Sequence, residues 1–523
     1  MTNLFARVAR WSVLTLTTLC VLLVWPLRSV ADEPAAAPIK AATSTVEDRW
    51  YVMQLMGSKA GYVHTIERTE GDTITTSSIL KLAIKRELLA IEISVESEFV
   101  ETVGGKPIRM KVTQTLSKSP VVEETIFGEK EWTITSTQNG RKTSRTREPI
   151  KGEWLAMAAA DRYVEAELKK GSKEIVVRTI DPQDGGSAIT VTRKIGGNEI
   201  VEVLGRTVPA VMWTSTVDKY PGIKSKEFVD ASGKTVRSEV NFGGMKMVQI
   251  LADKELALLD NKAPELLLSM MIQIVPGIDN PREVRKLTYI VSVDEDDLPD
   301  MPSVGAQRFT RIDAKSGRIV VDLDANSAGT EADKANTEFT RPSKMIGSDD
   351  PKIIEIARSA LAASGDKQPK TRSTSETAEV LRLFVYGYIS KKDMSVGFAT
   401  AGEVARTKTG DCTEHGVLLA ALLRASGIPS RVCTGVVYLP EIEAPGGKTM
   451  KDIFGYHMWT QALLPTAKDP TKLEWVDLDA TLPKAFDAAH ITIGVASLAD
   501  DATENFLITT APLIGRLKVK LDK

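Results

Sequence analysis

Cysteine is scarce in this chain of 523 residues, which contains three. Cys20 lies in the N-terminal apolar segment, which we expect to be cleaved off. The remaining chain then has only Cys412 and Cys433, and at most one disulfide. A helix from Cys412 to Ser426 would be about 21 Å long, and a strand returning from Arg431 covers about 10 Å by Cys433. The remaining gap exceeds the roughly 7 Å across which a disulfide forms. We therefore expect two free thiols, with Cys433 in a core strand.

A strong charge of either sign is also absent, because 67 Lys and Arg face 69 Asp and Glu. Removing the first 31 residues takes away three Arg and leaves a net charge of −5. Nucleic-acid-binding proteins normally carry a basic patch or stripe, so we expect no nucleic-acid partner. No stretch has the acidic spacing of a calcium loop, and the spacing of Cys412, His415, Cys433 and His457 matches no standard zinc pattern. The sequence thus predicts neither a metal nor a cofactor.

The chain has one long hydrophobic run, from Trp11 to Leu27, preceded by Arg7 and Arg10. Small residues at 29–31 stand where a signal peptidase would cut. At 17 residues, interrupted by Ser, Thr and Pro, the run is marginal for spanning a bilayer. We therefore predict a cleaved signal peptide (1–31) and an exported protein, periplasmic or extracellular. The alternative is an uncleaved N-terminal anchor, which would be the only membrane contact.

The rest of the sequence has two parts. The first is rich in strand-forming residues, and the second has both helical and strand-like patterns. Strand-like segments separated by turns predict antiparallel sheets before residue 325, and capping residues predict helices after 350. The predicted divisions are a flexible leader (32–48), an antiparallel β-rich domain (49–260), a smaller β region (261–325), a linker (326–345) and a catalytic domain (346–523).

Cys412 is the strongest candidate for a chemical role. Asp411 before it is a good helix N-cap, and Glu414 stands where a capping box needs it. The following run is apolar on nearly every face and ends at Gly427, which predicts a buried helix. In the first turn of a helix, the dipole and free N–H groups stabilise a thiolate. The alternative is an inert buried cysteine, so the choice depends on partners.

A predicted hairpin supplies those partners. Residues 455–465 and 474–481 have strand character, and the connection between them places the centre of an antiparallel hairpin near Lys468. This register sets His457 opposite Asp479, with both side chains on one face of the sheet. Asp479 would then accept one ring N–H of His457, and the other ring nitrogen would face the thiol.

The same register sets Trp459 opposite Asp477, and a two-residue slip would bring Asp477 to His457 instead. His415 lies close to Cys412 on the same helix face, so it either shapes the cleft or has a solvated or capping role. We expect His490 to be structural.

Four stretches of this region resemble the transglutaminase-like (papain-like thiol) superfamily, in its bacterial exported type. The resemblance covers residues 350–482, about a quarter of the chain. The matching stretches are Gly410 to His415, Leu422 to Val432, Tyr456 to Trp459 and Trp475 to Thr481. It implies an α+β fold, in which the helix bearing the cysteine packs on an antiparallel β-sheet, here preceded by large antiparallel β domains.

The resemblance implies Cys412 as nucleophile, His457 as general base and acid, and Asp479 as the residue that orients His457. Cross-linking enzymes of the animal type have a Trp upstream of the cysteine that helps hold the oxyanion, but this chain has no Trp between Trp213 and Trp459. We therefore expect the oxyanion donors to be the backbone N–H of Cys412 and a group from 395–401.

Acyl transfer through a thioester follows from such a triad. We favour hydrolysis of a peptide or carboxamide bond in a protein or peptide substrate. Glutamine transamidation, which cross-links proteins, is the first alternative. The second alternative is a non-catalytic scaffold whose β domains bind a partner in the cell envelope.

Overall fold

The computed structural model describes residues 45–522, except for 87–88, 183–185, 220–222, 243, 262–270, 364–371, 392–397, 445–447 and 501–509. The predicted signal peptide and most of the predicted leader therefore lie outside the described residues. Strand β1 begins at Thr45, so the last four residues assigned to the leader belong to a sheet. None of the helices in the described part is both long and apolar enough to cross a membrane.

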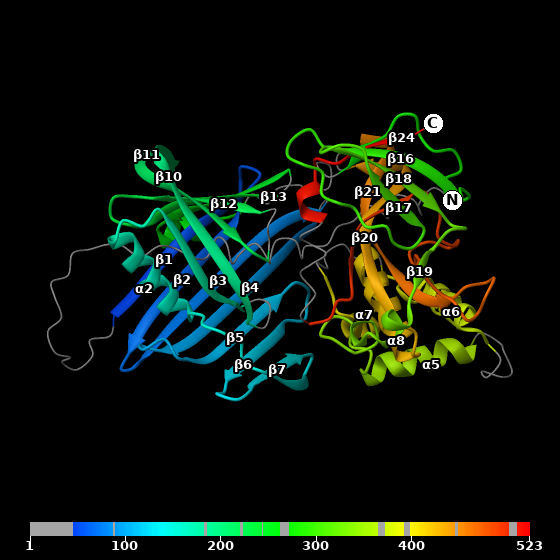
Figure 1. Ribbon diagram of the computed structural model, residues 1–523, viewed down its shortest axis with the longest axis horizontal. Coiled ribbons are helices and arrows are strands. Elements are labelled where there is room, and N and C mark those ends of the chain that lie inside the picture. The colour runs from blue at the N-terminus through cyan, green and yellow to red at the C-terminus, as the bar shows by residue number, and fades with distance from the viewer. Residues whose placement is uncertain are drawn as a thin grey trace. The chain divides into compact units, whose positions relative to one another are not determined.

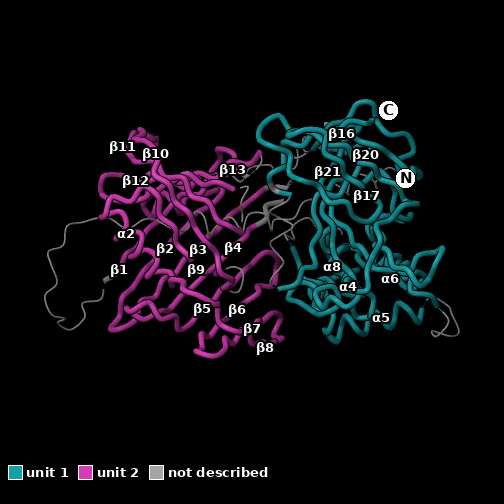
Figure 2. The backbone as a smooth tube through the Cα atoms, in the orientation of Figure 1, with its two compact units in different colours: residues 1–14, 86–89, 265–523 teal, residues 15–85, 90–264 magenta. Residues whose placement is uncertain are grey.

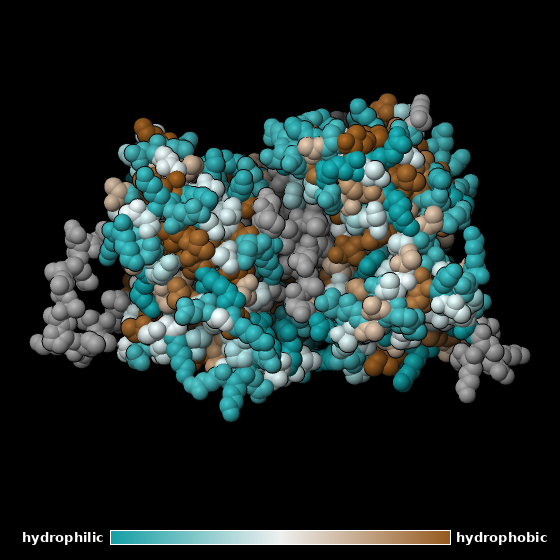
Figure 3. All heavy atoms as spheres, in the orientation of Figure 1, coloured by the Kyte–Doolittle hydropathy of each residue, from teal (hydrophilic) through white to brown (hydrophobic). Residues whose placement is uncertain are grey.

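The chain forms two compact units, shown in different colours in Figure 2. One contains residues 45–85 and 90–264 and is called the β unit below. The other contains Arg86, Leu89 and residues 265–522, and it is called the catalytic unit because it includes the predicted catalytic domain. Figure 3 shows hydrophilic residues over most of the visible surface of each unit, with hydrophobic residues in small groups. Large apolar side chains are buried in both units, among them Tyr51 and Phe99 in the β unit and Phe454 in the catalytic unit, and their burial drives folding.

The β unit is built on a 14-stranded antiparallel sheet with the order β8-β7-β6-β5-β4-β3-β2-β1-β14-β13-β12-β11-β10-β9 (Figure 1). Its strands are β1 (Thr45–Leu55), β2 (Ser58–Glu70), β3 (Thr73–Arg86), β4 (Leu89–Thr102), β5 (Pro107–Thr115), β6 (Val121–Phe127), β7 (Trp132–Gln138), β8 (Arg141–Arg147), β9 (Glu174–Asp181), β10 (Ser187–Val203), β11 (Arg206–Val217), β12 (Lys224–Val229), β13 (Thr235–Phe242) and β14 (Met245–Ala252).

The large sheet curls so that its two ends share a core. Ile180 of β9, at one end of the strand order, packs with Phe99 of β4 and Met110 of β5. Helix α2 (Met157–Lys169) fills the inside, where its Val164 packs on Trp213. A short helix, α3 (Lys254–Leu258), follows the last strand. Large sheets commonly curl in this way because strands twist, and curling buries one face.

The catalytic unit contains two antiparallel sheets. The six-stranded sheet has the order β19-β22-β21-β20-β23, with β15 also paired to β21, and the four-stranded sheet has the order β17-β18-β16-β24. The strands are β15 (Ile272–Gln273), β16 (Lys286–Ser292), β17 (Gln307–Arg311), β18 (Ser316–Asp322), β19 (Ser327–Gly329), β20 (Ser430–Ala444), β21 (Lys448–Pro465), β22 (Leu473–Leu478), β23 (His490–Ala496) and β24 (Lys518–Leu521).

Helices of the catalytic unit cluster before and around the six-stranded sheet. They are α4 (Glu331–Ala335), η5 (Thr337–Phe339), α5 (Pro351–Ala363), α6 (Thr374–Tyr388), α7 (Ala401–Thr407), α8 (Cys412–Ala425) and η7 (Ala511–Leu513). The predicted linker 326–345 contains β19, which pairs with β22, so this segment is part of the sheet. The domain boundaries proposed from composition remain predictions.

Helix α8 is the centre of this unit. Its residues from Cys412 to Arg424 are all buried, as the apolar run predicts. It packs against β20 and β21 on one side and against α5, α6 and α7 on others. Gly427, at a φ of 78°, ends the helix in the left-handed region that favours glycine. The fold is therefore α+β, with the cysteine-bearing helix packed on an antiparallel sheet.

Candidate active site

Cys412 is the first residue of α8, and its local sequence sets its position. Asp411 caps the helix by accepting the N–H of Thr413 at 3.1 Å, and Glu414 reaches back to accept the N–H of Asp411 at 2.9 Å. A Cβ at Gly410 would lie 2.2 Å from Cβ of Glu414, so glycine is required there. The Cys412 side chain is buried, with 4% exposure. Its thiol is free of any disulfide.

Two side chains fix α8 along β21. Thr460 donates its hydroxyl to the Gly416 carbonyl at 2.9 Å. Ser430, which pairs with Ala462 of β21, donates to the carbonyl of the residue one turn further along α8, also at 2.9 Å. Two residues of strand and four of helix each cover roughly 6 Å. One more step back puts Cys412 level with Met458, the residue after His457.

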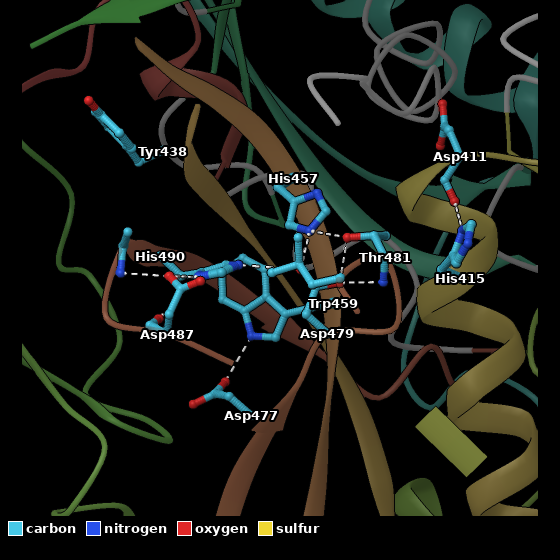
Figure 4. A network of polar contacts seen from close by, with 12 residues as sticks. Asp411, His415, Tyr438, His457, Trp459, Asp477, Asp479, Thr481, Asp487 and His490 are labelled. Carbon is cyan, nitrogen blue, oxygen red and sulfur yellow. Dashed lines mark hydrogen bonds and ion pairs between the residues drawn. The ribbon is translucent and has the colours of Figure 1, made fainter. Parts of the chain in front are cut away.

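His457 is bonded to Asp479. Its Nε2 lies 2.9 Å from Oδ2 of Asp479, and both side chains have no solvent exposure (Figure 4). The other ring nitrogen, Nδ1, is buried and has no hydrogen-bond partner among the residues that the structure describes. Burial opposes ionisation of Asp479, but the charge and hydrogen bond of His457 outweigh it and hold the pKa of Asp479 well below its usual value. A carboxylate facing Nε2 fixes the tautomer with a proton on Nε2, which leaves Nδ1 as the base.

Asp479 is itself held from three sides. Its Oδ1 accepts both the N–H and the hydroxyl of Thr481, each at 2.7 Å. The buried Arg382 of α6 donates to its carbonyl oxygen at 3.0 Å and to that of Leu482 at 2.7 Å. These contacts leave the carboxylate little freedom to turn away from His457. Arg382 was not singled out by the sequence, since one arginine in a helix gives no signal of its target.

The predicted hairpin register is wrong by two residues. Pro465 pairs with Leu473, and Thr466 N donates to the carbonyl oxygen of Lys472 at 2.8 Å. The loop therefore includes Lys472, and its centre lies at Asp469 instead of Lys468. A shift of two residues keeps every side chain on its face, so Asp479, just beyond the end of β22, still reaches His457 diagonally.

Asp477 has a different set of contacts. It accepts the indole N–H of Trp459 at 2.8 Å, the amide of Gln461 at 2.7 Å and the N–H of Ala306 at 3.0 Å. Burial raises its pKa, and these hydrogen bonds oppose the rise. Asp477 thus ties β21 and β22 to the 305–306 turn, and the structure pairs His457 with the other carboxylate.

A second histidine lies on the far side of Asp479. Nε2 of His490 is 3.3 Å from the same Oδ2, and Nδ1 is 3.0 Å from Oδ1 of Asp487 (Figure 4). Ligand atoms of His457, Asp479 and His490 lie within 4.8 Å of one another, close enough to share an ion. Each of these atoms already has a hydrogen-bond partner inside the group, so an ion would have to replace those bonds. His490 was expected to be structural, and its contact with the Asp479 carboxylate was not foreseen.

A family model matches the part of the chain that carries these residues. Residues 360–480 match the model described as the transglutaminase-like superfamily. This part of the chain is a transglutaminase-like domain. Uncharacterized proteins of Mycobacterium bovis and Mycobacterium tuberculosis are each 29% identical over 159 residues, which is 30% of this chain and 47% of theirs. The match thus spans about half the length of these curated relatives.

Two solved structures were also found. One, "The Crystal Structure of a Putative Cysteine Protease from Cytophaga hutchinsonii", has a TM-score of 0.24 at 13% identity and covers 48% of this chain and 82% of its own. The other, a "Beta-barrel-like Protein of Domain of Unknown Function DUF1849 from Brucella abortus", has a TM-score of 0.29 at 10% identity and covers 41% of this chain and 98% of its own.

Within the transglutaminase-like domain, Glu414 links the cysteine helix to the segment before α7. Its Oε1 accepts the N–H of Ala399 at 2.8 Å. Burial, followed by the negative charge of Asp411, raises the pKa of Glu414 to about 8, although backbone N–H groups oppose the rise. Ala401 donates its N–H to the carbonyl of Met345. Two N–H groups of the predicted oxyanion segment are therefore engaged elsewhere, and residues 395–397 lie outside the described residues.

The two remaining candidates have structural contacts. His415 is buried and bonds through Nδ1 to the carbonyl oxygen of Asp411, so it is not solvated. Cys433 is a fully buried residue of β20, and burial raises the pKa of its thiol well above the usual value. A thiol that resists ionisation is a poor nucleophile, which argues against a chemical role for Cys433.

Proposed function

We propose that the protein is a thiol hydrolase, which cleaves peptide or carboxamide bonds through a Cys412–His457–Asp479 triad and a thioester intermediate. The observation that carries this proposal is the state of His457. Its Nε2 is fixed on a buried carboxylate, while Nδ1 is buried and has no partner in the described part of the chain. Leaving a buried nitrogen unsatisfied costs free energy, and a site that keeps one is a candidate for proton transfer.

The first half of the reaction is acylation. Nδ1 of His457 takes the thiol proton of Cys412, and the thiolate attacks the substrate carbonyl carbon. The carbon–nitrogen bond breaks as the His457 imidazolium gives its proton to the leaving amine, and a thioester remains on the sulfur. Asp479 stays ionised and stabilises the imidazolium. The N-terminus of α8 favours the thiolate by its dipole.

The second half is deacylation. His457 removes a proton from water, and the resulting hydroxide equivalent attacks the thioester carbon. Collapse of the tetrahedral intermediate releases the carboxylic acid and returns the thiolate, with the proton on the ring. His457 thus acts as base and then as acid in acylation, and as base in deacylation.

Hydrolysis is proposed ahead of transamidation because the domain lacks an indole donor for the oxyanion upstream of the cysteine. The indole N–H of Trp459 is engaged by Asp477. The ring of Trp475 is covered by the guanidinium of Arg431, at 3.8 Å from its centroid. Both indoles are nearly fully buried, which fits a core role.

The activated thiol is tested by alkylation of the intact protein with iodoacetamide over a pH series, with peptide mass spectrometry to identify the modified residue. Cys412 should react at pH values well below the ordinary thiol pKa of about 8.5, and Cys433 should remain unmodified. A Cys412 profile with its midpoint near 8.5 would sink the activated-nucleophile proposal.

The acceptor is tested with a glutamine-containing peptide and a labelled primary amine. Hydrolysis predicts release of ammonia and a glutamate product, or cleavage of a peptide bond, without incorporation of the label. Label in the peptide would instead establish transamidation. The Cys412→Ala protein is the control for both products.

An exported location and a protein or peptide substrate belong to the same proposal. Fractionation of cells that express the full chain, with N-terminal sequencing of the product, tests the first. A product that begins at Asp32 supports cleavage, and a product that retains its first residues in the membrane fraction supports the anchor.

A further inference from the structure

The carboxylate of Asp479 lies between two imidazole rings. The same oxygen, Oδ2, is 2.9 Å from Nε2 of His457 and 3.3 Å from Nε2 of His490. The ring centroids of the two histidines are 5.9 Å apart. A triad needs only one of these rings, so the second calls for an explanation.

His490 is held in place by its own neighbours. Oδ1 of Asp487 faces its Nδ1 at 3.0 Å, and Arg282 donates to Oδ2 of Asp487 at 2.6 Å. The ring centroids of Phe486 and Trp459 lie 4.3 Å and 5.4 Å from the ring centroid of His490. These contacts hold the ring in a dry site, where hydrogen bonds and charges act strongly.

The hydrogen-bond geometry fixes the charge of His490. A neutral imidazole has one N–H, yet both nitrogens of His490 face carboxylate oxygens, which only accept. Both nitrogens must therefore donate, and the ring is an imidazolium. Burial opposes this charge, but Asp487 and the hydrogen bonds to both carboxylates outweigh it and raise the pKa of His490 to about 9.

Charges from several elements face this ring. Of the negative groups, Asp487 lies in the loop before β23, Asp479 lies just beyond β22, and Asp477 lies in β22. Of the positive groups, Arg282 pairs with Asp487 and His457 shares Asp479. The titratable or charged groups around His490 are Asp479, Asp487, Asp477, His457, Arg282 and, through Asp487, Tyr289.

We propose that His490 is a positioning residue for the thiol chemistry: a fixed imidazolium that holds Asp479 toward His457 and draws off part of the carboxylate's charge. This inference rests on the proposed function. The shared charge weakens the stabilisation that Asp479 gives to protonated His457, so the ring returns its proton to the leaving amine more readily. A triad without the second histidine would keep its thiolate–imidazolium pair over a wider pH range.

The first test needs no variant and no substrate. The chain has four histidines, so proton–nitrogen correlation spectra of the labelled full-length protein resolve every ring. His490 should show both nitrogens protonated at pH 7 and up to about pH 9. A single neutral tautomer of His490 at pH 7 would overturn the inference.

The second test compares His490→Gln with His490→Leu. Gln keeps a donor toward Asp479 without the charge, whereas Leu removes both. In the Gln protein, the titration midpoint of the His457 ring should rise by about one pH unit, a tenfold change in the protonated fraction. Turnover should fall further in the Leu protein, because Asp479 then loses a contact that orients it.

Asp487→Asn is the alternative if the His490 variants do not fold. It keeps an acceptor for Nδ1 but removes the charge that keeps the ring protonated, so His490 should titrate closer to the ordinary histidine value. A His457 midpoint that does not move in any of these proteins overturns the inference. Ring midpoints that move as expected in a protein without turnover would support the network and count against the proposed function alone.

Discussion

The two units differ in how their buried polar groups are hydrogen-bonded. In the catalytic unit, the carboxylates and rings around Asp479 bond one another, and within this described network the one ring nitrogen or carboxylate oxygen without a partner is Nδ1 of His457. In the β unit, several buried acceptors lack partners among the described residues, and they include Ser225 Oγ, Glu227 Oε2 and Gln249 Oε1.

Ser225 and Glu227 lie on β12, and Gln249 lies on β14. Glu227 accepts the hydroxyl of Ser215 at 2.7 Å, but its other oxygen is 3.8 Å from the guanidinium of Arg193, too far for a hydrogen bond. Buried water is the ordinary partner for such scattered atoms. A lone unsatisfied atom at the end of a complete network suggests chemistry, whereas several along a sheet suggest hydration. The following changes test that distinction.

The largest effect is expected for Cys412→Ala. Without the nucleophile, turnover should fall on the order of 10³-fold or more, while the free energy of unfolding changes by less than about 1 kcal/mol. Steady-state kinetics and chemical denaturation measure the two. The matched control is Cys433→Ala, which should reduce stability by about 1 kcal/mol and leave turnover within a few-fold. Equal losses of turnover in the two proteins would contradict the assignment.

The next effect separates the two carboxylates of the hairpin. Asp479→Asn should lower turnover roughly 10²- to 10⁴-fold, because an amide stabilises the wrong tautomer of His457. Asp477→Asn should mainly cost stability, about 1–3 kcal/mol, because its new N–H₂ would face the donors of Trp459 and Gln461. A greater loss of turnover in the Asp477 variant would assign the orienting role to Asp477.

Stability should depend on pH in the catalytic unit. The pKa of His490 is raised to about 9, so its contribution is complete below the unfolded value near 6.5 and is lost as pH rises through 9. The contribution of His490 to the free energy of unfolding amounts to about 3 kcal/mol. The raised pKa of Glu414, about 8, acts in the same direction from pH 4.5 upward.

Denaturant titrations of the full chain at pH 6 to 10 measure this loss. His490→Gln should flatten only the part between pH 6.5 and 9, since Glu414 is untouched. The transition assigned to the β unit should show no such step. A catalytic-unit stability that rises across this window would reverse the predicted sign.

The smallest effects compare single hydroxyls. Ser225→Ala in the β unit should change stability by less than about 0.5 kcal/mol, because the hydroxyl has no partner to lose among the described residues. Thr460→Val should cost about 1 kcal/mol, because it removes the bond that fixes α8 on β21. If Ser225→Ala proves the costlier change, the hydroxyl is held by an ordered water or ligand.

Much of the catalytic unit could be predicted from local sequence. Asp411, Glu414 and Gly427 fix the ends of α8 by capping and turn chemistry, which act within a few residues. The pairing of β21 with β22 followed from alternation and one short loop. The register error arose because loop closure depends on backbone hydrogen bonds of Thr466 and Lys472, which no side-chain pattern reveals.

The sequence alone determined the candidate triad, since Cys412, His457 and Asp479 stand in motifs whose local structure is set by caps and strand alternation. Only the tertiary structure decided what surrounds Asp479. Arg382 comes from α6, His490 from β23 and Arg282 from a segment nearly 200 residues earlier, and they meet through packing of separate elements. Local propensities act over one or two turns, whereas the charges that set a buried carboxylate's behaviour come from wherever the chain returns.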